Sequence, residues 1–326
     1  YKGIHKMGIE ITGWGKCTPS AVLTNQDLET ILDTNDEWIT TRTGVKERRI
    51  AEATLSEIGT IAAKHALAAA DKDPKTIEAV MVATCTPEYL IPSTASRIQM
   101  NIGNNTAAAF DFNSACTGFV YGLTTAYALI NSGVMNNILL VGGEKVSYFL
   151  DWTDRDTAVL FGDGAGAVIL EAKDYREGPT DQGILATDLN SDGRYRDLLY
   201  VDGGVSSTQT TGVLVIQGKE VFKHAVEKLS TTADTILEKT GLATSDIDWM
   251  VPHQANLRII KATAQKLKLP LEKVIITVQD HGNTSAASIP LALSVAKLEG
   301  KLKKQDLILM EAIGGGLAWG SILLRL

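Results

Sequence analysis

Short apolar runs alternate along the chain with longer stretches in which apolar residues recur at helical spacing. The runs from Ile77 to Thr84 and from Asn137 to Gly143 are continuous and bounded, which is typical of strands covered on both faces. The stretches from Thr54 to Ala70 and from about Gly218 to Thr240 have the periodicity of amphipathic helices. This alternation predicts an α/β protein.

The same order of blocks occurs twice. Three blocks of the first half are IEAVMVATCTPE, AAFDFNSACTGF and NILLVGGEK, and they resemble IDWMVPHQANL, VIITVQDHGNTSAAS and DLILMEAIGGG in the second half. Cys85 and Cys116 are 31 positions apart, and His253 and Asn283 are 30 apart. The sequence therefore predicts two α/β halves related by pseudo-symmetry, with loops at equivalent strand ends facing one another. We expect these halves over residues 1–172 and 212–326, with a connector poor in apolar periodicity over 173–211.

Composition narrows the function classes. The 326-residue chain has a net charge of −7 and no basic run, which argues against nucleic acid as a partner. No apolar stretch approaches the roughly 20 residues that a membrane-spanning helix needs, and the first residues lack the apolar region of a signal peptide. The three cysteines form no CxxC pair, which suits a reducing compartment and argues against a cysteine-rich metal site. We expect a cytoplasmic protein without a metal.

Cys116 is the candidate nucleophile. It stands where the predicted strand AAAFDF turns into a helix, and a helix N-terminus favours negative charge. This setting shifts a thiol, whose free pKa is about 8.5, toward the nucleophilic thiolate. The alternative is that Cys116 is a small buried apolar residue, as many free cysteines are.

His253 and Asn283 are candidate partners of Cys116. His253 directly follows an apolar strand, and Asn283 lies in HGNTSAAS before small residues that allow close packing. A Cys with a His and an Asn is a known catalytic set, but a chance triple is common. The predicted placement of all three on equivalent loops makes the set specific.

A second candidate site surrounds Trp38. Arg42, Lys46, Arg48 and Arg49 lie close to it in sequence, and an indole with flanking guanidinium groups can stack on adenine and neutralise phosphates. The alternative is a solvated basic face with one packed Trp. The glycines of FGDGAGA form no phosphate loop, because no GKS or GKT follows them.

These residues resemble the beta-ketoacyl-acyl-carrier-protein synthase III family of thiolase-like condensing enzymes. The resemblance covers nearly the whole chain from Met7. It rests on DEWITTRTG, the SACTGF segment around Cys116, FGDGAGA, VPHQAN, HGNTSAAS and GGGLAWG. It implies a five-layered thiolase-like αβαβα fold, a homodimer, and no cofactor. The implied reaction condenses an acyl-CoA starter with malonyl-acyl carrier protein and begins type II fatty-acid synthesis.

The resemblance also assigns site residues. It implies a catalytic triad of Cys116, His253 and Asn283, with an oxyanion hole formed by the backbone N–H groups of Cys116 and Gly315. The implied CoA contacts are Trp38, Arg42, Arg155, Gly218, Phe222, Ala255 and Asn256. The implied contacts with the carrier protein are Lys223, Gln254, Ala255, Asn256, Leu257, Arg258 and Lys266. The implied acyl pocket includes Ile91, Phe161 and Ile313.

Two departures from the family bear on the starter. Ile91 and Ile313 stand where an aromatic residue is common, and the Ile91 position in some relatives reaches the partner subunit's acyl pocket. Smaller side chains predict a roomier pocket that admits branched or longer starters. Gln265 stands where some relatives have a lysine, which predicts a weaker basic patch.

Alternative functions remain open at this point. A condensing enzyme of secondary metabolism would share the triad and differ in substrate. A degradative thiolase would have a second catalytic cysteine near the C-terminal glycines, and this chain has none there. The local signature of a papain-like protease is absent. A non-catalytic scaffold that binds carrier protein would not need the three candidate residues together.

Overall fold

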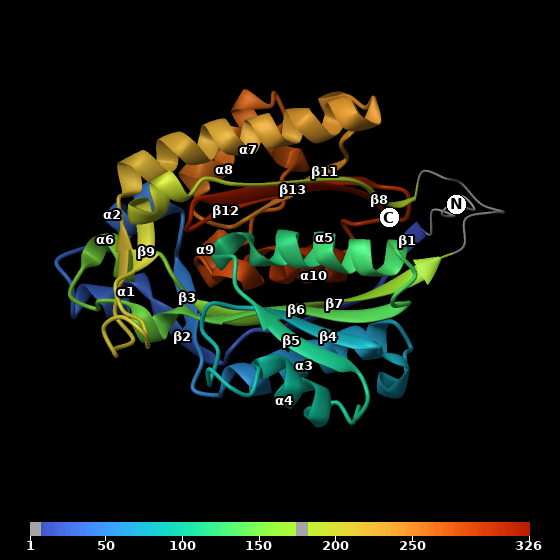
Figure 1. The fold of residues 1–326 in the computed structure, drawn as a ribbon. Coiled ribbons are helices and arrows are strands. Elements are labelled where there is room, and N and C mark those ends of the chain that lie inside the picture. The colour runs from blue at the N-terminus through green and yellow to red at the C-terminus, as the bar shows by residue number, and fades with distance from the viewer. Residues whose placement is uncertain (1–7, 174–181) are drawn as a thin grey trace.

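Two β-sheets with helices between and outside them form the body of the molecule (Figure 1). The structure is a computed structural model, and it describes residues 8–173 and 182–326. Its five layers run from α3 and α4, through the first sheet, the central pair α5 and α10, and the second sheet, to α7 and α8. The expected five-layered αβαβα architecture is confirmed.

The first sheet has five strands in the order β1-β7-β6-β4-β5. They are β1 (Gly8–Cys17), β7 (Asp163–Lys173), β6 (Asn137–Lys145), β4 (Ala79–Ala83) and β5 (Ala108–Phe112). The central strands β4 and β6 pair in parallel, and all five residues of β4 are buried. The continuous apolar run of that strand follows from cover on both faces.

The second sheet repeats this topology. Its order is β11-β12-β13-β8, built from β11 (Trp249–Pro252), β12 (Leu307–Gly314), β13 (Ala318–Arg325) and β8 (Gly183–Ser191). A parallel bridge from Met250 to Val274 adds a short fifth position beside β11, where β5 lies beside β4 in the first sheet. The pseudo-symmetry expected from the repeated blocks is therefore present in the sheets.

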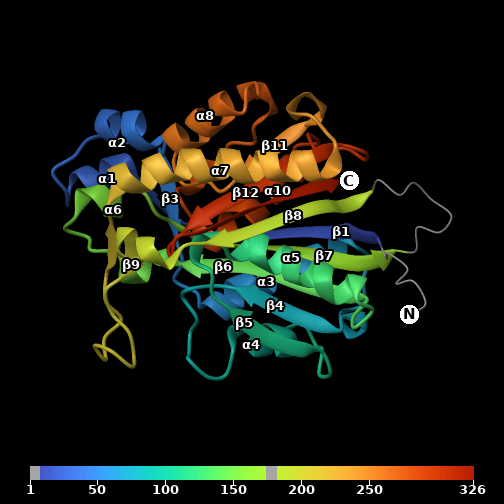
Figure 2. The same ribbon diagram turned by 45° about the horizontal axis from the view of Figure 1, so that its top comes forward.

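The central helices are apolar on nearly all sides because both of their faces are covered. They are α5 (Gly118–Asn131) and α10 (Ser288–Leu298). Phe119, Leu123 and Leu293 of these helices join one core cluster with residues from both sheets. The outer helices are amphipathic, since one side faces water. They are α3 (Leu55–Ala69), α4 (Thr94–Asn101), α7 (Gly218–Thr240) and α8 (Leu257–Lys266), and Figure 2 shows α7 and α8 over the second sheet.

Shorter elements gather at one end of the layers (Figure 1). Two small antiparallel pairs are β2 (Ala21–Thr24) with β3 (Glu47–Ile50), and β9 (Leu199–Val201) with β10 (Leu214–Ile216). The short helices are α1 (Asn25–Glu29), α2 (Asp36–Thr43), α6 (Arg155–Ala158) and α9 (Val278–His281). No helix within residues 8–173 and 182–326 has both the length and the apolar character that a membrane crossing requires.

The predicted connector over 173–211 differs from the structure in one respect. It contains β8, which pairs with β13 along eight positions and so belongs to the second sheet. Most residues of β8 are only partly buried, because an edge strand is covered less than a central one, and its sequence therefore lacks a continuous apolar run. Residues 174–181 of this range lie outside the described residues. The division into 1–172, 173–211 and 212–326 otherwise stays a prediction.

Strand β1 and helix α3 pack so closely that their backbones are in contact. A Cβ atom added at Gly15 would lie 2.0 Å from the carbonyl oxygen of Ala62. We expect Gly15→Ala to lower the free energy of unfolding by about 1–3 kcal/mol, the usual range for overpacking. The thermal midpoint measures the loss. Gly193→Ala is the matched control, because an added Cβ there meets no atom within 4 Å. Equal midpoints for the two variants would contradict the close contact.

Candidate active site

Cys116 lies in the turn between β5 and α5. This turn is a short 3-10 helix, Ala115–Thr117, and Ala115 has a positive φ of 46°. The Thr117 hydroxyl donates to the carbonyl of Ala318 at 2.8 Å, which ties the turn to the second sheet. The strand–turn–helix placement expected for Cys116 is therefore present.

A glycine loop after β12 packs against the nucleophile. A Cβ atom at Gly314 would lie 2.7 Å from the backbone nitrogen of Cys116, so only glycine leaves the required space. Gly315 follows it and lines the same cavity as Cys116. The structure thus brings together the two residues whose N–H groups are the expected oxyanion donors.

His253 directly follows β11 and is 4% exposed. Its Nδ1 lies 2.7 Å from the Ser288 hydroxyl oxygen, which also accepts the backbone N–H of Gln254 at 3.2 Å. The Ser288 hydroxyl can donate its proton to Nδ1, and this arrangement is compatible with a ring hydrogen on Nε2. Burial lowers the pKa of His253 to about 3, so the imidazole is neutral.

Asn283 is held by three hydrogen bonds. Its backbone N–H donates to Leu160 and its carbonyl accepts from Gly162, at 2.8 and 3.0 Å. Its side-chain Oδ1 accepts the backbone N–H of Ser285 at 2.8 Å. Fixing Oδ1 in this way leaves the amide hydrogens as the donors that Asn283 can offer elsewhere.

The loops that carry the three candidate residues converge at the N-terminal ends of the central helices. An added Cβ at Gly118 would lie 3.2 Å from the Cβ of Ala286, so the start of α5 contacts the turn after Asn283. His253 reaches the same region through Ser288, the first residue of α10. The candidate nucleophile Cys116 comes from the first half, and its candidate partners His253 and Asn283 come from the second.

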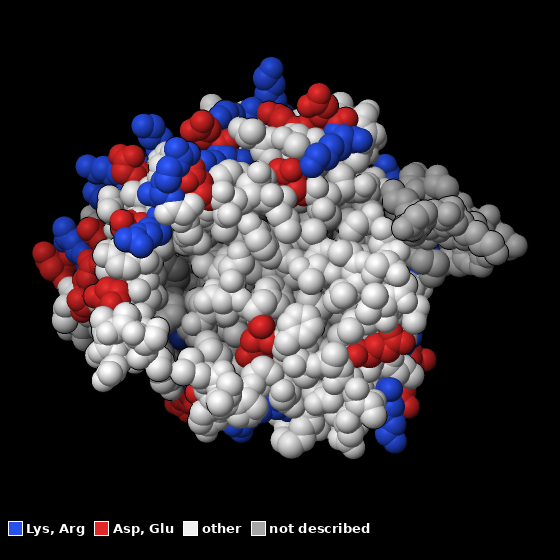
Figure 3. Space-filling model, in the orientation of Figure 1, with Lys and Arg blue, Asp and Glu red and all other residues white. Residues whose placement is uncertain are grey.

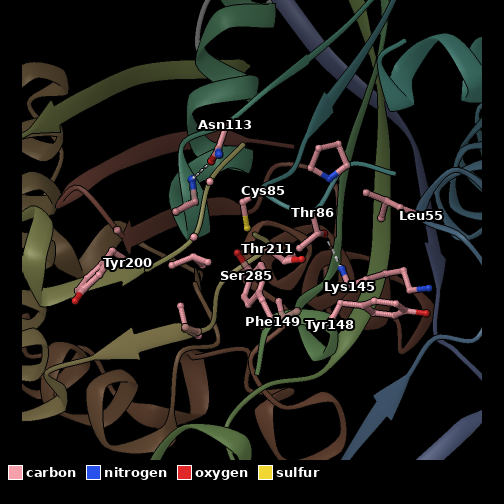
Figure 4. A pocket seen from close by; sticks show the side chains of 18 of the residues that line it. Leu55, Cys85, Thr86, Asn113, Lys145, Tyr148, Phe149, Tyr200, Thr211 and Ser285 are labelled. Carbon is pink, nitrogen blue, oxygen red and sulfur yellow. Dashed lines mark hydrogen bonds between the residues drawn. The ribbon is translucent and has the colours of Figure 1, made fainter. Parts of the chain in front are cut away.

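A cavity of about 990 Å³ opens at Cys116. Its wall includes apolar side chains from several elements, and Figure 4 shows Cys85, Thr86 and Ser285 near one another among the residues that line it. Phe161 lines the cavity as expected. Ile313 does not: it is 5% exposed and packs with Leu229 and Ile259 of the outer helices.

Ile91 is 86% exposed and does not line the cavity of its own chain. It lies in the loop between β4 and α4, where Tyr89 and Leu90 are also exposed. The Ile91 side chain therefore lies outside the cavity of its own chain and is accessible to another protein surface.

The expected depression of the Cys116 pKa is wrong for this structure. Burial raises the pKa of Cys116 to about 11, and the nearby Glu144 carboxylate adds to the rise, while hydrogen bonding with Ser285 opposes it. At pH 7 only about one thiol in ten thousand would be ionised. The sequence suggested the helix end but did not indicate that Cys116 is partly buried beside the carboxylate of Glu144.

Sequence reasoning missed the polar group beside Cys116. Glu144 at the end of β6 is fully buried and accepts hydrogen bonds from Thr86 and Ser285, at 2.8 and 3.1 Å. The available signal was a carboxylate directly after the apolar run NILLVGG, where a charge needs a specific partner.

Two guanidinium groups lie close to the ring of Trp38. The Cζ atoms of Arg42 and Arg155 are 4.6 and 5.1 Å from the centre of its ring. The structure therefore brings together three residues that are up to 117 positions apart, from Trp38 to Arg155. Arg155 also donates to the carbonyl of Asp33 at 2.6 Å.

The other expected CoA contacts lie near α7 and α8. Phe222 and Ala255 pack in the same cluster as Ile313. Gly218 is exposed at the first position of α7. Asn256 caps α8, and its side chain accepts the Ile259 N–H at 2.9 Å.

The expected carrier-protein contacts divide into two groups. Lys223, Arg258 and Lys266 are exposed, whereas Leu257 packs against Gly44. Gln254 is only 1% exposed, and its amide hydrogen bonds to four backbone groups of β11 and the segment after it. Its side chain therefore cannot contact a docked protein, and that assignment is wrong.

Within residues 8–173 and 182–326, no group of three His, Cys, Asp or Glu side chains has the geometry to hold a metal ion.

The chain is similar to known proteins over most of its length. Residues 110–193 match the model of 3-oxoacyl-[acyl-carrier-protein] synthase III, and residues 237–326 match the model of its C-terminal part. The chain is 56% identical over 317 residues to beta-ketoacyl-[acyl-carrier-protein] synthase III of Paracoccus denitrificans, covering 97% of this chain and 98% of that protein.

Solved structures agree as well. The 3-oxoacyl-[acyl-carrier-protein] synthase III of Aquifex aeolicus is 47% identical, with a TM-score of 0.92 over 98% of this chain and 100% of that one. The priming beta-ketosynthase of the R1128 polyketide pathway is 34% identical, with a TM-score of 0.92 over 100% of this chain and 98% of that one. Similarity of this extent leaves one conclusion: the chain belongs to the 3-oxoacyl-[acyl-carrier-protein] synthase III family of acyltransferases.

Proposed function

We propose that this chain condenses an acyl-CoA starter with malonyl-acyl carrier protein, releasing carbon dioxide and forming a 3-oxoacyl-acyl carrier protein. The observation that supports the proposal is the convergence of the loop of Cys116 with the loops of His253 and Asn283 from the opposite half. In this role the chain needs no cofactor, since acyl-CoA is a substrate. We place the reaction in the cytoplasm, at the start of type II fatty-acid synthesis.

The first half-reaction transfers the acyl group to Cys116. The sulfur attacks the thioester carbonyl and CoA leaves. The N–H groups of Cys116 and Gly315 donate to the oxyanion of the tetrahedral intermediate, and the glycine loop lets the acyl carbonyl approach that closely.

The second half-reaction uses His253 and Asn283. Loss of carbon dioxide from the malonyl group places negative charge on its thioester oxygen. The Nε2–H of a neutral His253 and the amide N–H of Asn283 stabilise this enolate, and its carbon attacks the acyl group on Cys116. The hydrogen bonds that fix Nδ1 and Oδ1 support this assignment, because both residues then present donors.

Two surfaces take the substrates. The arginine pair around Trp38 suits the adenine and phosphates of CoA, with Gly218, Phe222, Ala255 and Asn256 along the pantetheine arm. The exposed Lys223, Arg258 and Lys266 suit an acidic carrier protein. Arg258 lies 5.6 Å from the ring of Phe222, so the two surfaces adjoin.

The active form is a homodimer in this proposal. The edge strand β5 exposes Phe110, and the loop with Ile91 is apolar. The face over α5 and β5 carries few charged side chains in Figure 3, which favours contact with a second copy. Ile91 then reaches the partner's acyl pocket.

A second candidate function is the priming of polyketide synthesis. The similarity to the R1128 priming beta-ketosynthase favours it. Activity with a fatty-acid carrier protein, compared with a polyketide carrier protein under the same conditions, separates the two.

Acylation is the first test of the proposal. We expect a single acyl adduct after incubation with acetyl-, isobutyryl- or hexanoyl-CoA, and its discharge as a 3-oxoacyl product when malonyl-acyl carrier protein is added. Intact mass spectrometry measures both steps. Cys116→Ser is the control and should show no thioester adduct. Absence of an adduct from every acyl-CoA would exclude this condensing function.

Removal of His253 should separate the half-reactions. His253→Ala is expected to slow decarboxylation of malonyl-acyl carrier protein by about 100- to 1,000-fold, the usual loss for one oxyanion donor, while Cys116 is still acylated. Because the pKa of His253 is about 3, the wild-type decarboxylation rate should show no inflection near pH 6.5. An inflection there that His253→Ala removes would contradict the neutral-donor assignment.

Ile91 should set the upper size of the starter. Ile91→Phe fills more of the partner's pocket, so we expect hexanoyl transfer to fall at least about tenfold relative to acetyl transfer. Competition between the two acyl-CoAs measures the ratio. Leu298→Phe is the control, since Leu298 is 76% exposed at the far end of α10. An unchanged preference in Ile91→Phe refutes the roomier-pocket hypothesis.

A further inference from the structure

Glu144 is a fully buried carboxyl group that the mechanism above does not use. The hydroxyl groups of Thr84 and Thr86 donate to it at 3.1 and 2.8 Å, and the backbone N–H of Cys85 donates at 3.1 Å. The Cys85 thiol and the Ser285 hydroxyl, at 3.3 and 3.1 Å, complete the set. All five are donors, which is the environment of a carboxylate that can still accept a proton.

Ser285 donates a hydrogen bond to this carboxylate, and its turn packs against the turn that carries Cys116. It lines the same cavity as Cys116 and is 4% exposed. Its backbone has a positive φ of 50°, and its N–H donates to Oδ1 of Asn283. These contacts fix the position of the backbone from which the side chain extends. Its one hydroxyl proton points to Glu144, and its oxygen lone pairs remain to accept the S–H of Cys116.

The acylation step needs such a group. Cys116 keeps its proton at neutral pH, and a buried His253 with a pKa of about 3 is a poor base. Burial raises the pKa of Glu144, which makes that carboxylate a better proton acceptor, although its hydrogen bonds oppose the rise.

We propose that Ser285 and Glu144 form a proton relay that takes the Cys116 proton during acylation. This inference rests on the proposed function and deepens it. In this relay Ser285 accepts the proton of Cys116, and Glu144 acts through Ser285.

The proton balance of the step is complete. As the sulfur of Cys116 bonds to the acyl carbon, its proton passes to the Ser285 oxygen, and the serine proton passes to Glu144. As the bond from the acyl carbon to the CoA sulfur breaks, the same path returns a proton to that sulfur. The net reaction converts an acyl-CoA and a thiol into an acyl-enzyme and CoA thiol, with no further reactant.

Other titratable groups near Glu144 are otherwise engaged. The Cys85 thiol has its pKa raised well above the ordinary value by burial and by Glu144. Lys145 turns its ammonium to the carbonyl of Ala53 and the ring of Tyr148. Asp163 of the neighbouring strand β7 accepts from Ser147 and Ala51.

The test is the pH profile of acylation in a single turnover. Acetyl-CoA is mixed with the full chain between about pH 6 and pH 10, and acylated Cys116 is quantified by intact mass. We expect the wild-type rate to change little between pH 7 and 9. Ser285→Ala should be about 100-fold slower at pH 7 and rise toward tenfold per pH unit, because it must await the thiolate.

Glu144→Gln should show the same loss and the same slope. Thr84→Val is the matched control: it removes one hydrogen bond to the same carboxylate with little change of shape, and its profile should stay flat. The thermal midpoint of each variant reports its folding.

Three outcomes would overturn the relay. A flat wild-type-like profile in Ser285→Ala excludes it, and so does an equal loss and slope in Thr84→Val. A wild-type chain that no acyl-CoA labels overturns the proposed function and the relay together. The first two outcomes, in a chain that is still acylated, overturn the relay alone.

Discussion

The close contact between the two central helices and the sheets on either side is the constraint on which the site depends. A Cβ atom at Gly142 would lie 2.4 Å from the carbonyl of Ala286, and one at Gly166 would lie 2.7 Å from the backbone of Pro290. Small residues let the turn after Asn283 and the start of α10 press onto the first sheet. The strand–turn–helix junctions of both halves therefore meet at one place, and a catalytic cluster can be shared between them.

Desolvation determines the chemistry at this meeting point. It keeps His253 neutral and the Cys116 thiol protonated, because water cannot stabilise the ionised forms there. Neutral donors suit an enolate that gains and loses charge within one step. A protonated thiol, in contrast, has to lose its proton during attack. Burial therefore favours the decarboxylation step and disfavours the acylation of Cys116. The hydrogen-bonded carboxylate of Glu144 lies near Cys116, where the acylation step takes place.

The sequence predicted much of the fold, because the signals were local and repeated. The helix expected over Gly218 to Thr240 begins and ends where α7 does, and the duplicated blocks anticipated two sheets of matching order. Strand β8 was missed, because an edge strand that is half covered has no strong apolar pattern. For the site, the placement of Cys116, His253 and Asn283 on converging turns followed from chain order. The buried amide of Gln254 and the pKa of Cys116 could not be predicted, since both depend on which residues from distant segments surround them.

The paired sheet topology also bears on how such a chain could have arisen. The turn after β4 carries Cys85, and the corresponding turn after β11 carries His253; the turns into α5 and toward α10 carry Cys116 and Asn283. If both halves descend from one duplicated unit, an ancestral pair of identical subunits would have presented the same two turns twice around its axis. Fusion of the copies would have freed each turn to specialise separately. A turn in one half could then supply the nucleophile, and the equivalent turn in the other half could supply a hydrogen-bond donor. Identical subunits cannot differ in this way.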